Sequence, residues 1–383
     1  MTISHYSQTC KTFLGAGAAK LTGEKAKEFG CTKVLVVTDK VLHDLGVINP
    51  VIDSLKNAGI EYVLFDKVEP DPKDTCCDAG AKVGADNKVD GVVGIGGGSA
   101  MDAAKSIDLV ISNGGRTKDW YSTWDYKPLL PLILLPTTAG TGTENTIFSV
   151  ITDVDSGQKK VTFVVGTVAL CDPELTYALP KDVTSSTGID AFAHAAEGMT
   201  GKITNPMTDL ISPESIRLIM KWLPVACNDP KNPQARYEMM KAANFAGIAF
   251  SNCSCHFGHA VSQCMGAAFH VPHGISCAWA LPETMAYCAE VVPDRVKMVA
   301  DAMELKYDAG ISNSDLGLMV ADGIRDLMKS LGVKSMADYG ITRQQLIDIA
   351  EAVTQDNNFD LAPSTLTKAE VEMYLGKMYD KYC

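Results

Sequence analysis

Hydrophobic and polar positions follow two different patterns along the chain. Up to about residue 180, apolar runs of four to eight residues are separated by segments whose apolar positions recur at helical spacing. Beyond that point the short runs disappear, and helical spacing continues to the end of the chain. Short apolar strands joined by helices are typical of a mostly parallel sheet with both faces covered. The pattern therefore predicts an α/β domain over residues 1–180 and an all-helical domain over residues 181–383.

The individual elements can be placed by the same patterns. The predicted strands are 33–39, 61–65, 90–96, 129–136, 160–165 and 168–172, with helices at 45–58, 75–87 and 100–112. The helices predicted in the second part are 184–199, 213–223, 235–250, 257–268, 315–331, 343–354 and 367–380. Two of them have start signals: Ser212 precedes Pro213, and Thr367 is followed three residues later by Glu370.

Composition and charge exclude several classes of function. The net charge is −12 and no Lys/Arg run is available to neutralise phosphates, which argues against nucleic acid. The longest apolar run, 128–136, is too short to cross a bilayer, and the N-terminus lacks the apolar core of a signal peptide. The twelve cysteines include no C-x-x-C pair, so we expect buried apolar thiols in a reducing cytoplasm.

A run of glycines follows the strand predicted at 90–96. Gly96, Gly97, Gly98 and Ser99 open a predicted helix, where backbone N–H groups and the helix dipole can hold a phosphate. The alternative is a tight turn that needs glycine for its conformation. In an ordinary dinucleotide fingerprint the acid follows the glycines. Here Asp39 comes first, where it could accept hydrogen bonds from a ribose or simply cap a helix.

A second polar loop follows the strand predicted at 129–136. Thr137, Thr138 and Thr141 offer hydroxyls at the carboxyl edge of the predicted sheet, where α/β proteins bind ligands. By itself, the segment could also be a polar loop without a ligand.

Histidine is concentrated in one short stretch. Of the seven histidines, four lie in 255–274: His256, His259, His270 and His273. Upstream, Asp190 and His194 are four residues apart and share a face of a predicted helix. One carboxylate and three imidazoles can bind Fe²⁺ or Zn²⁺. The spacing leaves open which histidines are ligands, and a buried histidine can also be a hydrogen-bonded core residue.

Taken together, four segments resemble the iron-activated (group III) alcohol dehydrogenases, a family that includes lactaldehyde reductase and 1,3-propanediol dehydrogenase. These segments are GGGSAMDAAK, PTTAGTGTE, GIDAFAHAAEG and GHAVSQCMGAAFHVPHG, and the resemblance covers residues 10–290 approximately. It implies a dehydroquinate synthase-like fold, with an α/β NAD-binding domain and an all-helical domain that binds metal and substrate. His273 is expected in a loop of the helical domain.

The resemblance also implies roles for single residues. The metal ligands would be Asp190, His194, His259 and His273. The NAD(H) contacts would be Asp39, Gly96, Gly97, Gly98, Ser99, Asp102, Thr137, Thr138, Thr141 and Lys159, with Asp39 selecting NAD over NADP. The substrate pocket would include Phe148, Phe250, His270 and Asn358. His256 receives no role.

The chain departs from the family at three places, one of which is the segment VVGTVALCDPEL, a few residues shorter than in relatives. Gln263 stands where many relatives have a second histidine facing the active site, and residues 362–364 read APS instead of NPR. A glutamine can orient water or a hydroxyl group but cannot act as an acid or base near neutral pH. These departures leave the chemistry intact and the substrate open.

The expected function is an NAD-dependent, divalent-metal-dependent alcohol dehydrogenase or aldehyde reductase. Its substrate would be a short-chain primary alcohol, a diol or the matching aldehyde, and it would form a homodimer or larger homo-oligomer. One alternative is the reductase of an anionic aldehyde, of the succinic semialdehyde or sulfoacetaldehyde type. A dehydroquinate synthase-like lyase would need a basic cluster that these motifs lack. A non-catalytic metal- or nucleotide-binding protein would require that Gln263 marks a lost activity.

Overall fold

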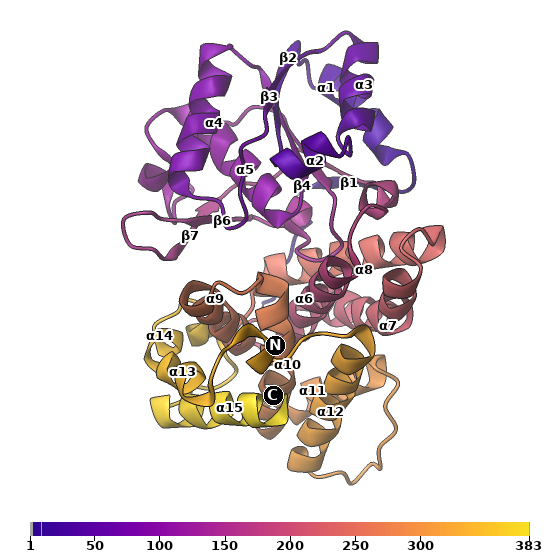
Figure 1. The fold of residues 1–383 in the computed structure, drawn as a ribbon, viewed down its shortest axis with the longest axis vertical. Coiled ribbons are helices and arrows are strands. Elements are labelled where there is room, and N and C mark those ends of the chain that lie inside the picture. Colours follow the sequence, from indigo (N-terminus) through magenta and orange to yellow (C-terminus); the bar gives the residue numbers. More distant parts are fainter. Residues whose placement is uncertain (1–2, 9, 383) are drawn as a thin grey trace. The chain divides into compact units, whose positions relative to one another are not determined.

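The computed structural model describes residues 3–8 and 10–382, and it divides into two compact units. The sheet unit comprises Gln8–Thr138 and Gly142–Ala178 (Figure 1). The helical unit comprises Leu179–Cys383, Ala139–Thr141 and the first residues of the chain.

The sheet unit is built on six strands that pair in parallel throughout. They are β1 (Lys11–Leu14), β2 (Lys33–Val37), β3 (Glu61–Phe65), β4 (Gly91–Gly96), β5 (Leu132–Pro136) and β8 (Val168–Cys171). The strand order is β1-β8-β5-β4-β2-β3. From β2 the chain passes to one side to form β3 and then returns to the other side to form β4. The carboxyl ends of β2 and β4 therefore flank a topological switch point, where open α/β sheets bind ligands.

Alternate residues of each strand point to opposite faces of this sheet, and both faces are covered. Val34 and Val36 pack with α1 (Thr22–Glu28) and α3 (Asn49–Ala58). Leu35 and Val37 pack with α4 (Asp74–Asp86) and α5 (Gly98–Asn113) on the other side (Figure 1). The expected parallel sheet between two helical layers is confirmed.

Two strands of the sheet unit were not expected from the sequence. The first is β6 (Phe148–Thr152). It pairs with β7 (Lys159–Phe163), the strand predicted at 160–165, in a separate antiparallel hairpin. The other unexpected strand is β1, a short edge strand beside β8. The short helices of this unit are η1 (Ala18–Leu21), α2 (Lys40–Asp44), η2 (Thr117–Trp120), η3 (Thr143–Asn145) and η4 (Pro173–Thr176).

The helical unit surrounds one large apolar core. Its long helices are α6 (Lys181–Thr200), α7 (Pro206–Asn228), α8 (Pro233–Cys253), α9 (Phe257–Phe269), α10 (His273–Val291), α11 (Pro293–Ala302), α12 (Asn313–Leu331) and α15 (Lys368–Lys381). Shorter ones are η5 (Ala337–Tyr339), α13 (Arg343–Asp348), α14 (Ala350–Thr354) and η6 (Phe359–Leu361). The all-helical character expected of this part is confirmed.

Helix starts show where the sequence was read correctly and where it was not. Thr367 and Glu370 form the expected capping box at the start of α15. The start predicted at Pro213 is wrong, because α7 begins seven residues earlier at Pro206 and continues through Pro213. The side chain of Asn205 accepts from Thr208 N at 2.9 Å and caps that earlier start.

In the part of the chain that the structure describes, no helix is both long and apolar enough to span a membrane.

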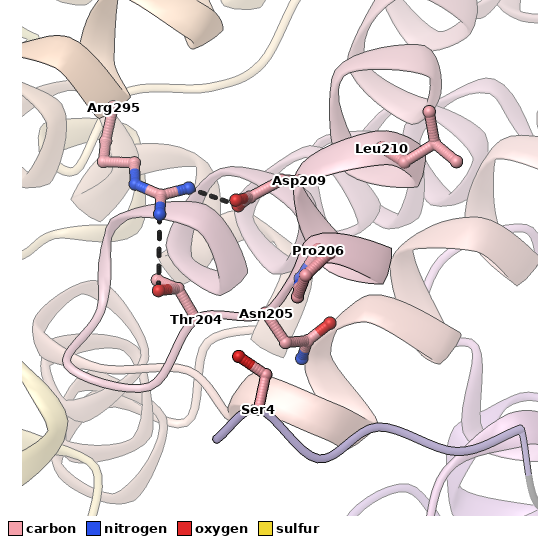
Figure 2. A pocket seen from close by; sticks show the side chains of 7 residues that line it. All are labelled: Ser4, Thr204, Asn205, Pro206, Asp209, Leu210 and Arg295. Carbon is pink, nitrogen blue, oxygen red and sulfur yellow. Dashed lines mark hydrogen bonds and ion pairs between the residues drawn. The ribbon is translucent and has the colours of Figure 1, made fainter. Parts of the chain in front are cut away.

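A surface pocket lies where the N-terminal segment meets α7 and α11 (Figure 2). Arg295 donates to Asp209 there and to Thr204 Oγ1 at 3.4 Å.

A buried acid in α5 makes the stability of the fold depend on pH. Asp108 Oδ1 accepts from Ser112 Oγ and Leu130 N, both at 3.1 Å, whereas Oδ2 has no hydrogen-bond partner among the described residues. Burial raises the pKa of Asp108 from 3.8 to about 7. The folded protein therefore keeps a proton that the unfolded chain loses near pH 4. The contribution of Asp108 to the free energy of unfolding is therefore fully present below pH 4. It is lost as the pH rises from 4 towards 7, because only the unfolded chain releases the proton in that range.

We expect Asp108→Asn to remove this contribution. The free energy of unfolding of the wild type, minus that of Asp108→Asn, should fall between pH 4 and pH 7 by about 1.4 kcal/mol per unit of pKa shift. Urea denaturation at several pH values measures this difference, with exposed Asp53→Asn as the matched control. A difference that does not change with pH would contradict the prediction.

Candidate metal and active site

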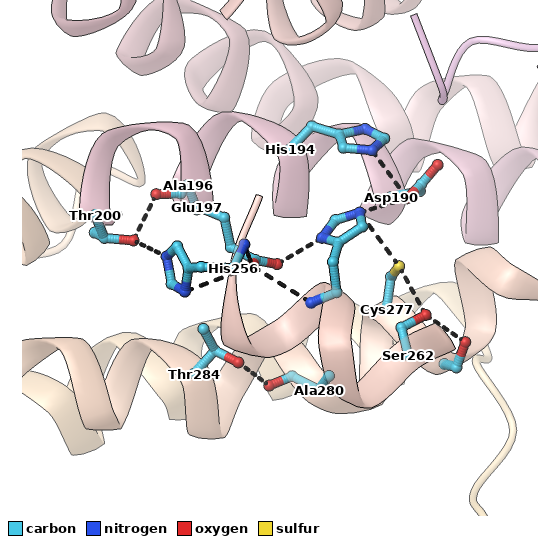
Figure 3. Close-up of polar contacts among 12 residues, drawn as sticks. Asp190, His194, Ala196, Glu197, Thr200, His256, Ser262, Cys277, Ala280 and Thr284 are labelled. Atoms are coloured by element: carbon cyan, nitrogen blue, oxygen red, sulfur yellow. Dashed lines mark hydrogen bonds and ion pairs between the residues drawn. The ribbon is translucent and has the colours of Figure 1, made fainter. Parts of the chain in front are cut away.

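Three helices of the helical unit bring one carboxylate and three imidazoles together. Figure 3 shows two of these residues, Asp190 and His194, with Glu197 on the same helix. Asp190 and His194 lie one turn apart on α6, His259 lies on α9, and His273 is the first residue of α10. His273 is therefore helical, and the expected loop position is corrected. Asp190 Oδ1 lies 3.8 Å from His194 Nε2 and 3.7 Å from the Nε2 atoms of His259 and His273.

This arrangement fits a divalent metal ion. Separations of 3.7–3.8 Å are too long for hydrogen bonds, and Asp190 Oδ1 is buried without a hydrogen-bond partner among the described residues. An uncompensated buried carboxylate is costly, whereas a cation shared with three imidazoles would satisfy it. Burial lowers the pKa of His194 to about 4, so that its ring is neutral and can donate a lone pair. Nitrogen and oxygen donors of this kind suit Fe²⁺ or Zn²⁺.

Three of the four clustered side chains are buried and one is exposed. The side chains of Asp190, His194 and His259 are 2%, 6% and 6% exposed, whereas that of His273 is 41% exposed. His273 is therefore the member of the cluster that solvent reaches. Elsewhere the ring of His194 is covered by Phe250, which stacks on it with centroids 4.4 Å apart.

A buried carboxylate orients His259. Glu197, one turn beyond His194 on α6, places Oε1 2.7 Å from His259 Nδ1. Burial raises the pKa of Glu197, but His259 and His256 outweigh burial and hold that pKa at about 2. An ionised Glu197 favours a proton on His259 Nδ1 and so directs the Nε2 atom of that ring towards Asp190. Carboxylates that fix a metal-binding histidine in this way are usual at metal sites.

His256, which received no role from the sequence, extends this contact. It is fully buried at the N-cap of α9, and its backbone N–H donates to Glu197 Oε2 at 2.7 Å. Its Nε2 atom lies 2.9 Å from Thr200 Oγ1, which in turn donates to Ala196 O (Figure 3). His256 therefore contacts Glu197, which in turn contacts His259, and His256 is not itself one of the clustered ligands.

A serine orients the third histidine, beside a thiol. Ser262 Oγ lies 3.2 Å from His273 Nδ1, which directs the Nε2 atom of that ring towards Asp190. Cys277, one turn after His273 on α10, places Sγ 3.1 Å from Ser262 Oγ. Cys277 is buried, as expected of the cysteines, but its thiol lies among polar side chains.

The remaining residues of the expected pocket take different positions. Gln263 is half-buried on α9, one turn after His259. His270 is exposed, ends α9 in a left-handed conformation with φ 54° and is not among the clustered ligands. Asn358 precedes η6, and its N–H donates to Asp356 Oδ1 at 2.8 Å. In the sheet unit, Phe148 packs against Phe163 of the β6–β7 hairpin.

In the sheet unit, the expected cofactor residues gather at the carboxyl ends of β2, β4 and β5. Asp39 Oδ1 caps α2 by accepting from Leu42 N at 2.9 Å, as the alternative interpretation held. Its Oδ2 faces Gly96, where an added Cβ would lie 3.7 Å away. Gly96 has φ +154°, and its carbonyl accepts from Thr137 N at 2.9 Å.

The backbone of the glycine turn is not crowded at Gly97. An added Cβ there would meet only Thr138, in ordinary van der Waals contact at 3.5 Å and beyond. Gly97 caps the start of α5, and Gly98 and Ser99 form its partly exposed first turn. Backbone N–H groups at such a helix start can bind the phosphates of a dinucleotide.

Other expected cofactor residues are placed as follows. Asp102 is buried one turn into α5, and burial raises its pKa to about 6. Lys159, on the β6–β7 hairpin, forms an ion pair with Asp71. Thr141 is part of the segment Ala139–Thr141, which groups with the helical unit.

Four residues that shape these sites were not expected from the sequence. Glu197 lies inside the segment GIDAFAHAAEG, and its spacing of three residues from His194 was a usable signal. Cys277 follows His273 by one helical turn, but the helix itself was not predicted. Ser262 gave no signal. Lys105 is a fully buried lysine, and only the structure shows that its ammonium group holds the loop after β5.

Comparison with known proteins identifies the family. Residues 9–173 match the model described as "Iron-containing alcohol dehydrogenase" and residues 184–379 match "Fe-containing alcohol dehydrogenase family, C-terminal". A choline dehydrogenase from Bacillus subtilis is 34% identical over 349 residues, which cover 89% of this chain and 87% of that protein.

Two solved structures have the same fold. A 1,3-propanediol oxidoreductase superposes with a TM-score of 0.94 at 30% identity, covering 99% of this chain and 100% of the other. The sulfoacetaldehyde reductase of Bifidobacterium kashiwanohense in complex with NAD+ gives 0.89 at 30% identity, with 99% of each chain covered. The resemblance drawn from the four sequence motifs is confirmed. The chain belongs to the iron-containing alcohol dehydrogenase family and is an oxidoreductase that acts on CH–OH groups.

Proposed function

We propose that this enzyme interconverts short primary alcohols or diols and their aldehydes, using NAD(H) and a divalent metal held by Asp190, His194, His259 and His273. The observation that carries the proposal is the buried Asp190 Oδ1, which lacks a hydrogen-bond partner among the described residues and lies 3.7–3.8 Å from three imidazole nitrogens. Residues 1–180 would hold the cofactor and residues 181–383 the metal and substrate. A cytoplasmic location and a homodimer or larger homo-oligomer stay predictions.

When bound, the metal supplies Lewis acidity at the alcohol or aldehyde oxygen, and NAD(H) supplies the hydride chemistry. The protein contributes alignment. Glu197 and Ser262 hold the rings of His259 and His273 with their Nε2 atoms towards Asp190. Phe250 covers His194 and keeps water from that side of the cluster. Gln263, one turn from His259, would orient a water or a substrate hydroxyl group without titrating.

For the cofactor, the uncrowded backbone at Gly97 and the first turn of α5 would hold the pyrophosphate. The second carboxylate oxygen of Asp39, which does not cap α2, would accept from the adenosine ribose and repel a 2′-phosphate.

We expect Asp39→Asn to narrow the preference for NADH over NADPH. Asparagine still caps α2 but removes the charge, so the ratio of kcat/KM values should fall about tenfold, equivalent to about 1.4 kcal/mol of repulsion. Steady-state kinetics with both cofactors measure the ratio, and Asp44→Asn on the exposed side of α2 is the control. An unchanged ratio would mean that Asp39 acts only as a helix cap.

Substrate class is tested by NADH oxidation with anaerobically purified, Fe²⁺-loaded enzyme against short aldehydes. The panel should include neutral, anionic and cationic members, because the relatives include a choline dehydrogenase, a propanediol oxidoreductase and a sulfoacetaldehyde reductase. The proposal expects the highest kcat/KM with a neutral aldehyde. A clear preference for sulfoacetaldehyde or succinic semialdehyde would replace it with the anionic alternative.

A further inference from the structure

Cys277 lies inside the ligand cluster. The ligand atoms of Asp190, His259, His273 and Cys277 all lie within 4.8 Å of one another. Cys277 Sγ is 3.5 Å from His273 Nε2 and 3.8 Å from His259 Nε2. These are the same nitrogen atoms that face Asp190 Oδ1, so the sulfur and the carboxylate oxygen approach a common space.

These separations match a shared metal. Metal–sulfur bonds of about 2.3 Å and metal–nitrogen bonds of about 2.0–2.1 Å allow the two donor atoms to lie at most about 4.4 Å apart, and both observed separations fall within this limit. The second, independent observation is Asp190, a 2% exposed side chain whose Oδ1 has no hydrogen-bond partner in the described ranges and points into the same space.

We propose that Cys277 Sγ binds the metal directly, as a donor beside Asp190, His259 and His273. The proposal rests on the metal site of the proposed function and adds a thiolate to its one carboxylate and three imidazoles. Ser262 Oγ, 3.1 Å from Sγ, is placed to hydrogen-bond the bound sulfur. Thiolate is a soft ligand, so this donor set favours Zn²⁺ or Fe²⁺ over the harder Mg²⁺ and Ca²⁺.

The position of Cys277 in the fold supports a defined role. It is one helical turn after His273, so the two side chains share a face of α10. Cys288 lies further along the same helix and is fully buried, but it is not part of the cluster. Cys255 is buried near His194 and His259 and is the one other thiol grouped with possible ligands among the described residues.

Cobalt substitution distinguishes a thiolate ligand from a neighbouring thiol. The intact protein is stripped of metal with a chelator, reloaded anaerobically with Co²⁺, and analysed for cobalt per chain and for near-ultraviolet absorption. Thiolate bound to cobalt gives a strong charge-transfer band that nitrogen and oxygen ligands do not give. The expected result is one cobalt per chain with this band, which Cys277→Ser loses while it still binds cobalt. Cys255→Ser and the matched control Cys288→Ser should keep the band.

Bound cobalt without the band in the wild type, or a band that survives in Cys277→Ser, would overturn the thiolate ligand and leave the metal site intact. Failure of the wild type to bind cobalt at all would overturn the metal site of the proposed function as well. If Cys277→Ser does not fold, Cys277→Ala replaces it, and the wild-type spectrum alone still decides whether any thiolate is bound.

Discussion

Asp190→Ala is expected to abolish turnover while NADH binding stays largely intact. The Nε2 atoms of His194, His259 and His273 all lie 3.7–3.8 Å from Asp190 Oδ1. Without this carboxylate, the three imidazoles lose the anion that would hold a cation among them. Because a catalytic metal supplies several kcal/mol of transition-state stabilisation, we expect kcat to fall on the order of 10³-fold or more.

Two measurements separate this loss from a general effect. Steady-state NADH oxidation gives the loss of turnover, and NADH fluorescence titration gives the affinity for the cofactor. Asp182→Ala, at an exposed position in the first turn of the same helix, is the matched control and should behave as wild type. Asp190→Asn, which keeps the shape of the side chain, serves if the alanine variant is unfolded. Near-normal activity in Asp190→Ala or Asp190→Asn would refute the assignment of Asp190 as a metal ligand.

Lys105→Met is expected to have the largest effect on stability. Lys105 is fully buried in α5, and its Nζ donates to the carbonyl oxygens of Thr143, Thr146 and Phe148 at 2.7–2.8 Å. Methionine fills the space but offers no donor, so three carbonyl groups lose this partner. Thr143 O and Phe148 O each keep a hydrogen bond from Thr146, so the main loss is at Thr146 O. At about 1–3 kcal/mol for a polar group that loses its partner, we expect the free energy of unfolding to fall by about 1–3 kcal/mol.

Urea denaturation of the sheet unit, followed by tryptophan fluorescence, measures this loss. Lys82→Met is the matched control, because Lys82 is 74% exposed and its ion pair with Asp86 contributes little. The loop that Lys105 holds leads from the threonine segment after β5 into β6. Equal stabilities of Lys105→Met and Lys82→Met would show that the buried ammonium group does not stabilise the fold.

The α/β half of the fold could be predicted because its signals are local. Apolar runs such as 91–96, followed by glycines and an amphipathic helix, fix strand, turn and helix without reference to the rest of the chain. The same argument fails for β1, whose four residues are only partly buried beside β8. It also fails for the β6–β7 hairpin, because the sequence shows a strand but not its partner.

The helical half was predicted less completely for physical reasons. α10 is apolar on nearly every side, so its sequence has no polar face and no helical periodicity. At α7, Pro213 suggests a helix start, but Asn205 followed by Pro206 is the stronger signal. A proline inside a helix costs stability, and here the packing of α7 in the core outweighs that cost.

The candidate site was predicted from motif resemblance and not from spacing. Spacing could not separate His259 and His273 from His256 and His270, since all four lie within twenty residues. The structure separates them by position: two face Asp190, one lies behind Glu197, and one ends a helix in solvent. The approach of Cys277 to the cluster depends on how α9 and α10 pack, which no local pattern encodes.

The most direct test of this account is a metal titration of the stripped enzyme. Chelated apoprotein would receive Fe²⁺ in increments under anaerobic conditions, with NADH oxidation measured at each step against a reactive short aldehyde. The account predicts no activity without metal and a linear rise that stops at one Fe²⁺ per chain. Full activity in the metal-free protein, or no activity once one Fe²⁺ per chain is bound together with NADH, would contradict a metal-dependent dehydrogenase at Asp190.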